Sequence, residues 1–158
     1  MDQVRLDPIG EGDPRLEIVA QLFRDYAAEL NEDLCFQSFE EELETLPGVY
    51  APPKGSLILA VDSQENVLGC VALKERGPDL AELKRLYIVP EARGKGLATI
   101  MCQEILHIAK EIGYSQVCLD TLDRMVPAVK LYESLGFRRG EPYYENPLAG
   151  VLYFYIDL

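Results

Sequence analysis

Several features that mark membrane, metal-binding and secreted proteins are missing from this sequence. It has no tryptophan, a single histidine (His107) and no apolar run near the ~20 residues that cross a bilayer. Its four cysteines are scattered without a C-x-x-C pair, so we expect small buried thiols in a reducing compartment and no metal site. The opening residues, Met-Asp-Gln-Val-Arg, lack the apolar core of a signal peptide, which predicts a cytoplasmic protein.

Positive charge is also scarce. The chain has 15 lysines and arginines against 27 acidic residues, and its formal net charge is −12. Such an excess of negative charge makes duplex nucleic acid and anionic membrane surfaces poor partners. It favours a cationic or amine-bearing substrate instead.

The rest of the composition is that of an ordinary globular protein. Hydrophobic residues make up 48% and charged residues 27% of the 158 residues, which excludes a disordered chain. This length predicts one domain over residues 1–158, with enough buried surface for a hydrophobic core.

Hydrophobic periodicity predicts four helical segments, at residues 13–30, after Ser38, at 97–112 and at 128–135. Asp13 followed by Pro14 is the expected start of the first helix, and Ser38 with Glu41 forms a candidate capping box. Strands are expected at residues 56–61, 67–74, 82–89, 116–119, 137–139 and 151–156.

The order of these elements predicts the fold class. The strand–helix–strand unit over residues 82–119 should be parallel and right-handed, whereas the other strands should pair antiparallel. We therefore expect an α/β (α+β) fold with a single mixed, mostly antiparallel sheet flanked by helices.

The loop between the strand at 82–89 and the helix at 97–112 carries the clearest chemical signal. Residues 89–98 read VPEARGKGLA, which places two glycines and two cations at the start of a helix. The first N–H groups of a helix have no intrahelical partner, and glycine lets the backbone approach an anion closely. The loop therefore predicts a phosphate or pyrophosphate site, although it matches neither the P-loop nor the dinucleotide-binding pattern.

This region resembles a known family. Arg93-x-x-Gly96-x-Ala98, preceded by Leu-Tyr-Ile-Val-Pro, is similar to the acetyl-CoA signature of the GNAT N-acetyltransferases. The segments ELKRLY (82–87), LDT (119–121) and LYESLGF (131–137) follow in the family's order. The resemblance extends from about residue 67 to the end of the chain and implies a GNAT-like fold with acetyl-CoA as co-substrate.

The resemblance also implies cofactor contacts. The side chain of Arg93 and the N–H groups of the loop should hold the CoA pyrophosphate. Those N–H groups belong to Gly94, Lys95, Gly96, Leu97, Ala98 and Thr99. The backbone of Leu86, Tyr87 and Ile88 should pair with the pantetheine arm, where the strand splays from its parallel neighbour, often through a bulge.

Further contacts follow from the same likeness. A backbone N–H at Ile88 or Val89 should receive the acetyl oxygen. In one place the sequence departs from the family's pattern, because Met125 stands where many members carry an asparagine that touches the pantetheine.

Acetyl transfer to an amine needs a base, a donor for the oxyanion and a proton for the leaving thiolate. Tyr132 matches the family's tyrosine near the CoA sulfur and is the candidate acid. Glu82 is the first candidate base, since some members carry a catalytic glutamate at its strand position, and Asp120 on the next strand is the second. Either carboxylate could instead form an ion pair or bind a cationic substrate.

Other candidate groups have simpler structural interpretations. His107 is expected at the surface, and the run Glu40-Glu41-Glu42 is expected to be a solvated helix face. Four tyrosines near the C-terminus favour strand packing over an acceptor cleft: Tyr143, Tyr144, Tyr153 and Tyr155.

We therefore predict an enzyme that moves an acetyl group from acetyl-CoA to a primary amine in a ternary complex. The amine could belong to a small molecule, a peptide N-terminus or a lysine. The acidic composition favours a cationic acceptor such as a polyamine, an aminoglycoside or an amino-acid derivative. A homodimer is compatible with the resembled family.

Two other classes of protein are also compatible with the sequence. One is a non-catalytic acyl-CoA-binding sensor or regulatory module, which would keep the loop but release no CoA with any amine. The other is a structural or interaction protein whose glycine loop is only a turn, which would not bind CoA. Acetyl-CoA binding and turnover distinguish the three hypotheses.

Overall fold

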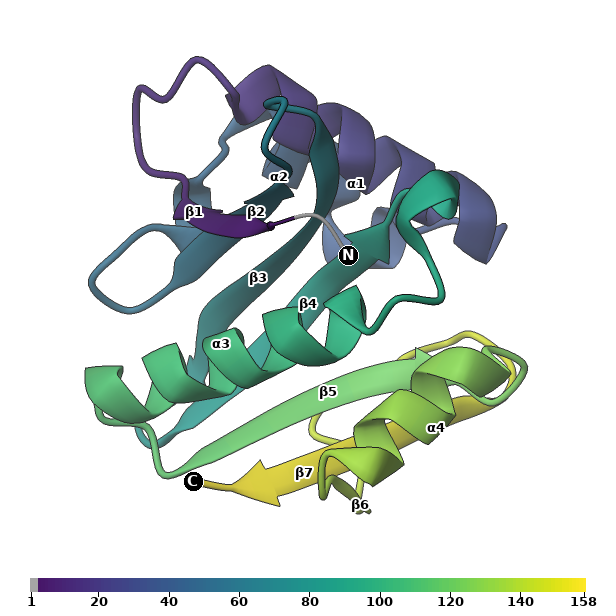
Figure 1. The fold of residues 1–158 in the computed structure, drawn as a ribbon. Helices are drawn as coiled ribbons and strands as arrows, with labels where there is room; N and C mark the ends of the chain where they lie inside the picture. Colours follow the sequence, from purple (N-terminus) through teal and green to yellow (C-terminus); the bar gives the residue numbers. More distant parts are fainter. Residues whose placement is uncertain (1–2) are drawn as a thin grey trace.

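One mixed sheet organises the chain, as the computed structural model of residues 3–158 shows (Figure 1). The strand order is β1-β2-β3-β4-β5-β7-β6. The strands are β1 (Arg5–Pro8), β2 (Ser56–Val61), β3 (Val67–Gly77), β4 (Leu80–Ile88), β5 (Gln116–Leu122), β6 (Arg138–Arg139) and β7 (Val151–Asp157). All neighbouring strands are antiparallel except β4 and β5, so the predicted fold class is confirmed. The first two residues, which belong to the opening segment without the apolar core of a signal peptide, lie outside the described residues.

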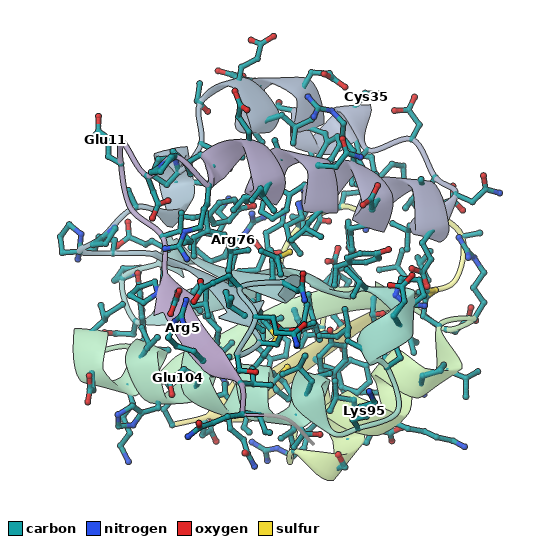
Figure 2. All side chains as sticks on the ribbon, turned by 45° about the horizontal axis from the view of Figure 1, so that its top comes forward. Arg5, Glu11, Cys35, Arg76, Lys95 and Glu104 are labelled. Atoms are coloured by element: carbon teal, nitrogen blue, oxygen red, sulfur yellow. The ribbon has the colours of Figure 1, made fainter. Side chains whose placement is uncertain are left out.

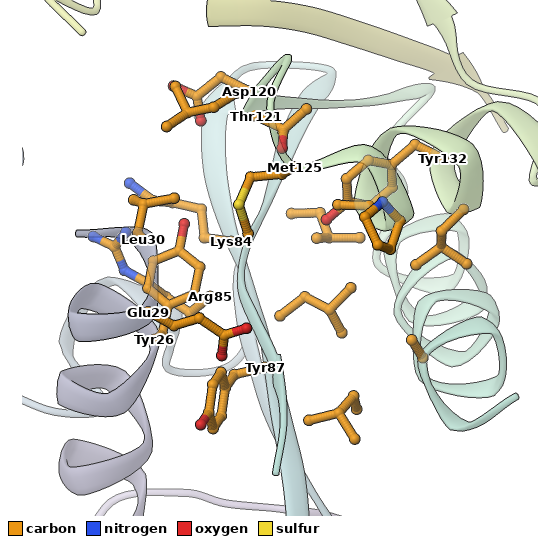
Figure 3. Close-up of a pocket in the computed structure, with 18 of the residues that line it drawn as sticks. Tyr26, Glu29, Leu30, Lys84, Arg85, Tyr87, Asp120, Thr121, Met125 and Tyr132 are labelled. Carbon is orange, nitrogen blue, oxygen red and sulfur yellow. The ribbon is translucent and has the colours of Figure 1, made fainter. Parts of the chain in front are cut away.

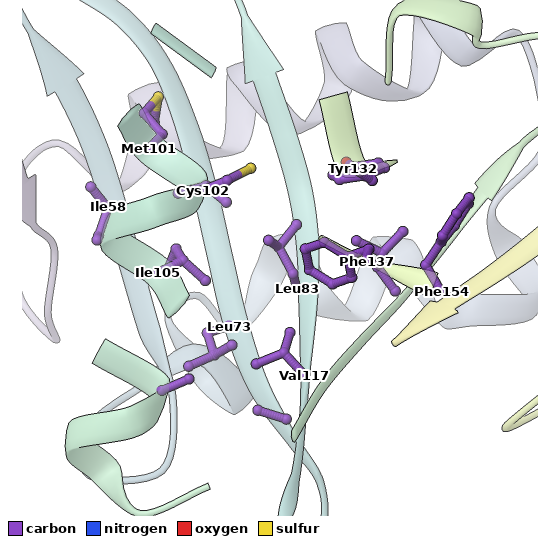
Figure 4. Close-up of a cluster of buried hydrophobic side chains, with 14 of the residues drawn as sticks. Ile58, Leu73, Leu83, Met101, Cys102, Ile105, Val117, Tyr132, Phe137 and Phe154 are labelled. Atoms are coloured by element: carbon purple, nitrogen blue, oxygen red, sulfur yellow. The ribbon is translucent and has the colours of Figure 1, made fainter. Parts of the chain in front are cut away.

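Helices cover both faces of this sheet (Figure 1). The α-helices are α1 (Leu16–Leu30), α2 (Phe39–Glu44), α3 (Leu97–Ile112) and α4 (Val126–Ser134), and the short 3₁₀ turns are η1 (Cys35–Gln37), η2 (Gly48–Tyr50) and η3 (Pro90–Ala92). One buried cluster joins α1 and α2 to the sheet, and a second, drawn in Figure 4, joins α3 and α4 to the opposite face. Every residue of β2 is buried, because both faces of this strand are covered.

Several predicted boundaries need correction. Helix α1 begins at Leu16 instead of Asp13, whose carboxylate accepts a hydrogen bond from the Arg15 N–H (2.9 Å) in the turn before the helix. The capping box at Ser38 is wrong, because Ser38 has a φ of 56° and its side chain makes no capping bond. Strand β1 was missed, since its four residues are too few for a periodic pattern.

The cysteines follow the prediction in three of four cases. Cys70, Cys102 and Cys118 are buried and free, and burial raises the pKa of the Cys102 and Cys118 thiols to about 12. Cys35 is exposed at the periphery of the molecule (Figure 2), so the prediction of a buried thiol is wrong there.

A bulge and an early parting of two strands shape the centre of the sheet. Val71 of β3 faces two residues of β4, Arg85 and Leu86, and Arg85 has a φ of 61°. The parallel pairing of β4 with β5 covers only residues 80–82 and 116–118. Beyond this point the two strands separate, as the resemblance implied.

The bulge changes which side chains face α1 and α2. In a regular strand, neighbouring residues point to opposite faces, but both Lys84 and Arg85 lie on the α1 side of β4 (Figure 3). Arg85 is 2% exposed, and its guanidinium donates to both Glu42 oxygens at 2.8 and 2.9 Å. The acidic run is therefore not wholly solvated, because Glu42 turns inward to pair with Arg85.

This buried ion pair yields a stability prediction. Glu42→Gln leaves the Arg85 guanidinium buried without a countercharge, so we expect the free energy of unfolding to fall by about 3–5 kcal/mol. The matched control is Glu41→Gln, which removes an exposed carboxylate from the same helix and should change stability by less than about 0.5 kcal/mol. Urea denaturation measures both variants, and equal stability of the two would contradict the assigned role of the pair.

Candidate active site

A cavity of about 380 Å³ lies where β4 and β5 part, between α1 on one side and α3 and α4 on the other (Figure 3). Its wall contains most of the residues predicted to bind a cofactor: Leu86, Tyr87, Ile88, Arg93, Gly94, Gly96, Leu97, Ala98 and Thr99. Tyr132, Asp120 and Met125 also line it, whereas Glu82, Val89 and Lys95 do not. The splayed strands thus bring the glycine loop, the candidate acid and one candidate base to a single cavity.

The start of α3 presents open backbone donors to this cavity. Gly94 and Gly96 have φ values of 79° and 81°, a left-handed conformation that glycine adopts without strain. Gly96 is the N-cap of α3, and no side chain caps this end. Within residues 3–158, none of the N–H groups of residues 94–99 donates to a protein acceptor, and the first bonded N–H is that of Ile100. This arrangement suits a phosphate anion.

The Arg93 side chain is engaged with the protein itself. Its Nε donates to the Ile88 carbonyl at 2.8 Å, and its terminal nitrogens lie 2.9 and 2.5 Å from the two Glu29 oxygens. The guanidinium also lies 5.4 Å from the centre of the Tyr87 ring. Arg93 therefore fastens the loop to β4 and α1. These contacts use three of the five guanidinium N–H groups, and a direct contact between Arg93 and a pyrophosphate stays a prediction.

Hydrogen bonding distinguishes the two predicted donors for the acetyl oxygen. The Val89 N–H donates to the Leu68 carbonyl of β3 at 2.9 Å, so it is already used. In an antiparallel pair, successive N–H groups point alternately toward and away from the partner strand. The N–H of Ile88 therefore points away from β3, on the same side as its carbonyl, which accepts from Arg93. Ile88 is the available donor.

Lys95 lies apart from the cavity. Its side chain is exposed and borders a separate hollow of about 220 Å³ together with Asp62 and Glu91. Only its backbone N–H belongs to the open group at the start of α3.

Tyr132 enters the cavity from α4, on the opposite side from α1 (Figure 3). The residue is 7% exposed, and its ring packs edge-on against Phe137 with a centroid distance of 5.7 Å. Burial raises the pKa of its phenol well above the ordinary value. Its hydroxyl makes no hydrogen bond within the described residues, so Tyr132 is a protonated donor that faces the cavity.

Asp120 lies on the α1 side of the gap between the strands (Figure 3). The Tyr144 hydroxyl donates to its Oδ2, and the Asn146 amide donates to the same oxygen at 2.8 Å. Its other oxygen accepts no hydrogen bond from residues 3–158. One carboxylate oxygen is thus fixed by the protein, and the other is available to a substrate.

Glu82 does not line the cavity, and its carboxylate is bound by Tyr143. It is 1% exposed, its Oε2 accepts from the Tyr143 hydroxyl at 2.5 Å, and its Oε1 lies 3.6 Å from an Arg76 nitrogen. Burial, followed by the nearby Glu82 charge, raises the pKa of the Tyr143 phenol. Of the two candidate bases, only Asp120 has direct access to the cavity.

Sequence reasoning missed Asn146, Lys84 and Gln37 as cavity residues. Asn146 lies in the irregular segment between β6 and β7, where no periodic pattern indicates its position. The four C-terminal tyrosines pack against one another, with centroid distances of 5.2 to 6.2 Å. The prediction of strand packing holds for Tyr153 and Tyr155 of β7, whereas Tyr143 and Tyr144 lie in the irregular segment before it. His107 is exposed and lies 2.8 Å from Glu111, as expected of a surface residue.

Among residues 3–158, no group of three or more His, Cys, Asp or Glu side chains is placed to hold a metal ion. No helix in this part of the chain has the length and apolar character needed to cross a membrane.

Comparison with known proteins identifies the family. The profile described as the Acetyltransferase (GNAT) family matches residues 16–137, which include the glycine loop and Tyr132. This chain belongs to the GNAT family.

Individual relatives agree with this assignment. An uncharacterized N-acetyltransferase of Schizosaccharomyces pombe is 41% identical over 144 residues, which cover 90% of this chain and 88% of that protein. Human N-acetylaspartate synthetase is 40% identical over 90 residues, or 56% of this chain and 30% of that protein. The structure of spermidine N-acetyltransferase from Vibrio cholerae in complex with CoA and spermine has a TM-score of 0.73 at 24% identity, covering 98% and 95% of the two chains. The chain is an N-acetyltransferase of the GNAT fold.

Proposed function

We propose that this GNAT protein transfers the acetyl group of acetyl-CoA directly to a primary amine while both substrates are bound. The observation that carries the proposal is a single cavity, which joins the open N–H groups of residues 94–99 to Tyr132 and Asp120 through the gap between β4 and β5.

The cofactor would enter from the α3 and α4 side. The CoA diphosphate binds the N–H groups at the start of α3, where the helix dipole favours negative charge. The pantetheine arm runs along the backbone of Leu86 to Ile88, where β4 has no neighbouring strand on its β5 side. The thioester then lies in the gap, within reach of the Tyr132 hydroxyl.

The acceptor amine would enter from the α1 side. The free oxygen of Asp120 binds the ammonium group and takes one proton, directly or through water, since only the neutral amine is a nucleophile. The amine nitrogen forms a bond to the thioester carbon, and the Ile88 N–H donates a hydrogen bond to the oxygen that becomes negative. The carbon–sulfur bond breaks, and Tyr132 gives its proton to the leaving thiolate. The nitrogen then releases its second proton through water to the Tyr132 phenolate, which restores the phenol.

The names of the relatives support an amine acceptor but no particular amine. One is named for N-acetylaspartate and another for spermidine, and both names describe an acetyl group on an amine nitrogen. The proposed acceptor class is therefore a primary amine. The homodimer implied by the family stays a prediction.

The role of Asp120 gives a testable variant. Asp120→Asn keeps a similar shape but cannot take a proton, so we expect kcat at neutral pH to fall about 100-fold. Activity should recover as the pH rises toward the pKa of the acceptor amine, because a neutral amine needs no base. The measurement is kcat across pH for both proteins. A constant ratio of the two kcat values at all pH values would contradict a role as base.

A screen of amines tests the proposed function itself. Purified protein is incubated with acetyl-CoA and each candidate amine, and the released CoA thiol is measured. Release that depends on one of the amines supports the proposal. Tight binding of acetyl-CoA without release in the presence of any amine would favour the non-catalytic acyl-CoA-binding module instead.

A further inference from the structure

Three of the five charged side chains in the cavity wall form ion pairs within the protein. The charged side chains that line it are Glu29, Lys84, Arg85, Arg93 and Asp120. Two of them, Glu29 and Arg93, pair with each other, and Arg85 pairs with Glu42. Within residues 3–158, no carboxylate lies within 4.0 Å of the Lys84 ammonium, whose one hydrogen bond is a long one of 3.4 Å to the Gln37 amide oxygen.

Lys84 and Asp120 lie on the same face of the sheet. Glu82 of β4 pairs with Cys118 of β5, and Lys84 and Asp120 are each two residues further along their strands. Because side chains two residues apart share a face, both point toward the α1 side, beyond the point where the strands separate. Figure 3 shows both on that side and Tyr132 on the other. The acceptor half of the cavity therefore contains one cation and one anion that are not paired with each other.

We propose that the acceptor is an amino acid with a free carboxylate, which Lys84 binds while Asp120 binds its amino group. This inference rests on the proposed function and names its substrate class. An amino acid supplies the missing countercharge to Lys84 and an ammonium group to the free oxygen of Asp120. A polyamine would place further positive charge beside Lys84, which is unfavourable. Within residues 3–158, Asp120 is the only carboxylate of the cavity wall without a cationic partner, so one carboxylate would have to bind all the ammonium groups that enter this half of the cavity.

The environment of Lys84 agrees with this assignment. Burial and the neighbouring Arg85 lower the pKa of Lys84 to about 8, against the opposing effect of Glu82, Glu42 and Asp120. Gln37 of η1, which also faces Lys84, is uncharged. A bound carboxylate favours the protonated lysine, so by linkage the amino acid binds best below pH 8 and more weakly as the pH rises through 8.

The test compares each amino acid with its own amide, which replaces the carboxylate by a neutral group of similar shape. The standard amino acids, their amides and spermidine are assayed with acetyl-CoA by thiol release. In the unaltered protein, the preferred amino acid should have a kcat/KM at least about tenfold above that of its amide. In Lys84→Met this ratio should fall at least about tenfold, mainly through KM. Lys84→Arg keeps the positive charge and should keep most of this preference for the amino acid over its amide. Its affinity for the amino acid should not fall above pH 8.

The outcomes separate the inference from the proposed function. Turnover of spermidine or amides in preference to amino acids would overturn the inference and leave the acetyltransferase standing. An equal loss of kcat for acid and amide in Lys84→Met would assign Lys84 to proton transfer and also overturn it. If none of these acceptors releases the CoA thiol but another primary amine of the wider screen does, the inference fails and the proposed function stands. If no amine of either set does, the proposed function fails as well. Unchanged acetyl-CoA affinity and thermal stability of the variants show that they are folded.

Discussion

Thr99→Glu is expected to raise the Kd for acetyl-CoA about 100-fold while the protein stays folded. Thr99 lies in the first turn of α3 and lines the cavity beside the open N–H groups. A carboxylate about 6 Å from the CoA diphosphate costs about 3 kcal/mol at an effective dielectric constant of about 20. The same carboxylate is favourable for the helix, because negative charge in the first turn complements the helix dipole.

The control for this variant is Thr99→Gln, which adds the same bulk without charge. Calorimetric titration with acetyl-CoA should give a Kd for Thr99→Gln within about tenfold of the unaltered protein. If the Gln and Glu variants lose affinity equally, the effect is steric and the charge argument fails. If neither loses affinity, the diphosphate does not bind at this helix end.

Tyr132→Phe is expected to lower kcat by about 100- to 1000-fold, with little change in acetyl-CoA affinity. The aromatic ring that packs on Phe137 is kept, and the lost hydroxyl has no protein partner among residues 3–158 that would be left unsatisfied. The variant therefore removes a proton donor and leaves the fold intact. Steady-state kinetics together with calorimetry separate these two effects.

Tyr155→Phe is the matched control, since its hydroxyl bonds to the Glu141 carbonyl and the residue lies outside the cavity. This variant should keep the kcat of the unaltered protein within about threefold. A Tyr132→Phe protein with the same kcat as this control would remove Tyr132 from the mechanism.

The parts of the site that could be predicted are formed by residues that lie close together in the sequence. The glycine loop follows a strand and precedes a long amphipathic helix, so short-range patterns indicated both the open N–H groups and their position. The parallel pairing of β4 and β5 followed from the helix between them. Tyr132 was found because its segment resembles the family.

The parts that could not be predicted depend on contacts between distant residues. The bulge at Arg85 turns its side chain to the α1 face, and its partner Glu42 is 43 residues away. Asn146 reaches Asp120 from an irregular segment that is held by contacts with residues distant in the sequence, such as the hydrogen bond from the Tyr143 hydroxyl to Glu82. Glu82 was favoured as base by its strand position, but the tertiary fold places Tyr143 against it and leaves Asp120 in the cavity.

The cofactor site is tested most directly by a nuclear magnetic resonance titration of ¹⁵N-labelled protein with CoA, which needs neither a variant nor a known acceptor. We expect the amide protons of residues 94–99 to shift downfield as they begin to donate to the diphosphate. Pantetheine, which lacks the diphosphate, should not shift them. CoA binding that leaves these amides unshifted, or equal shifts with pantetheine, would contradict the claim that the open helix end is the cofactor site.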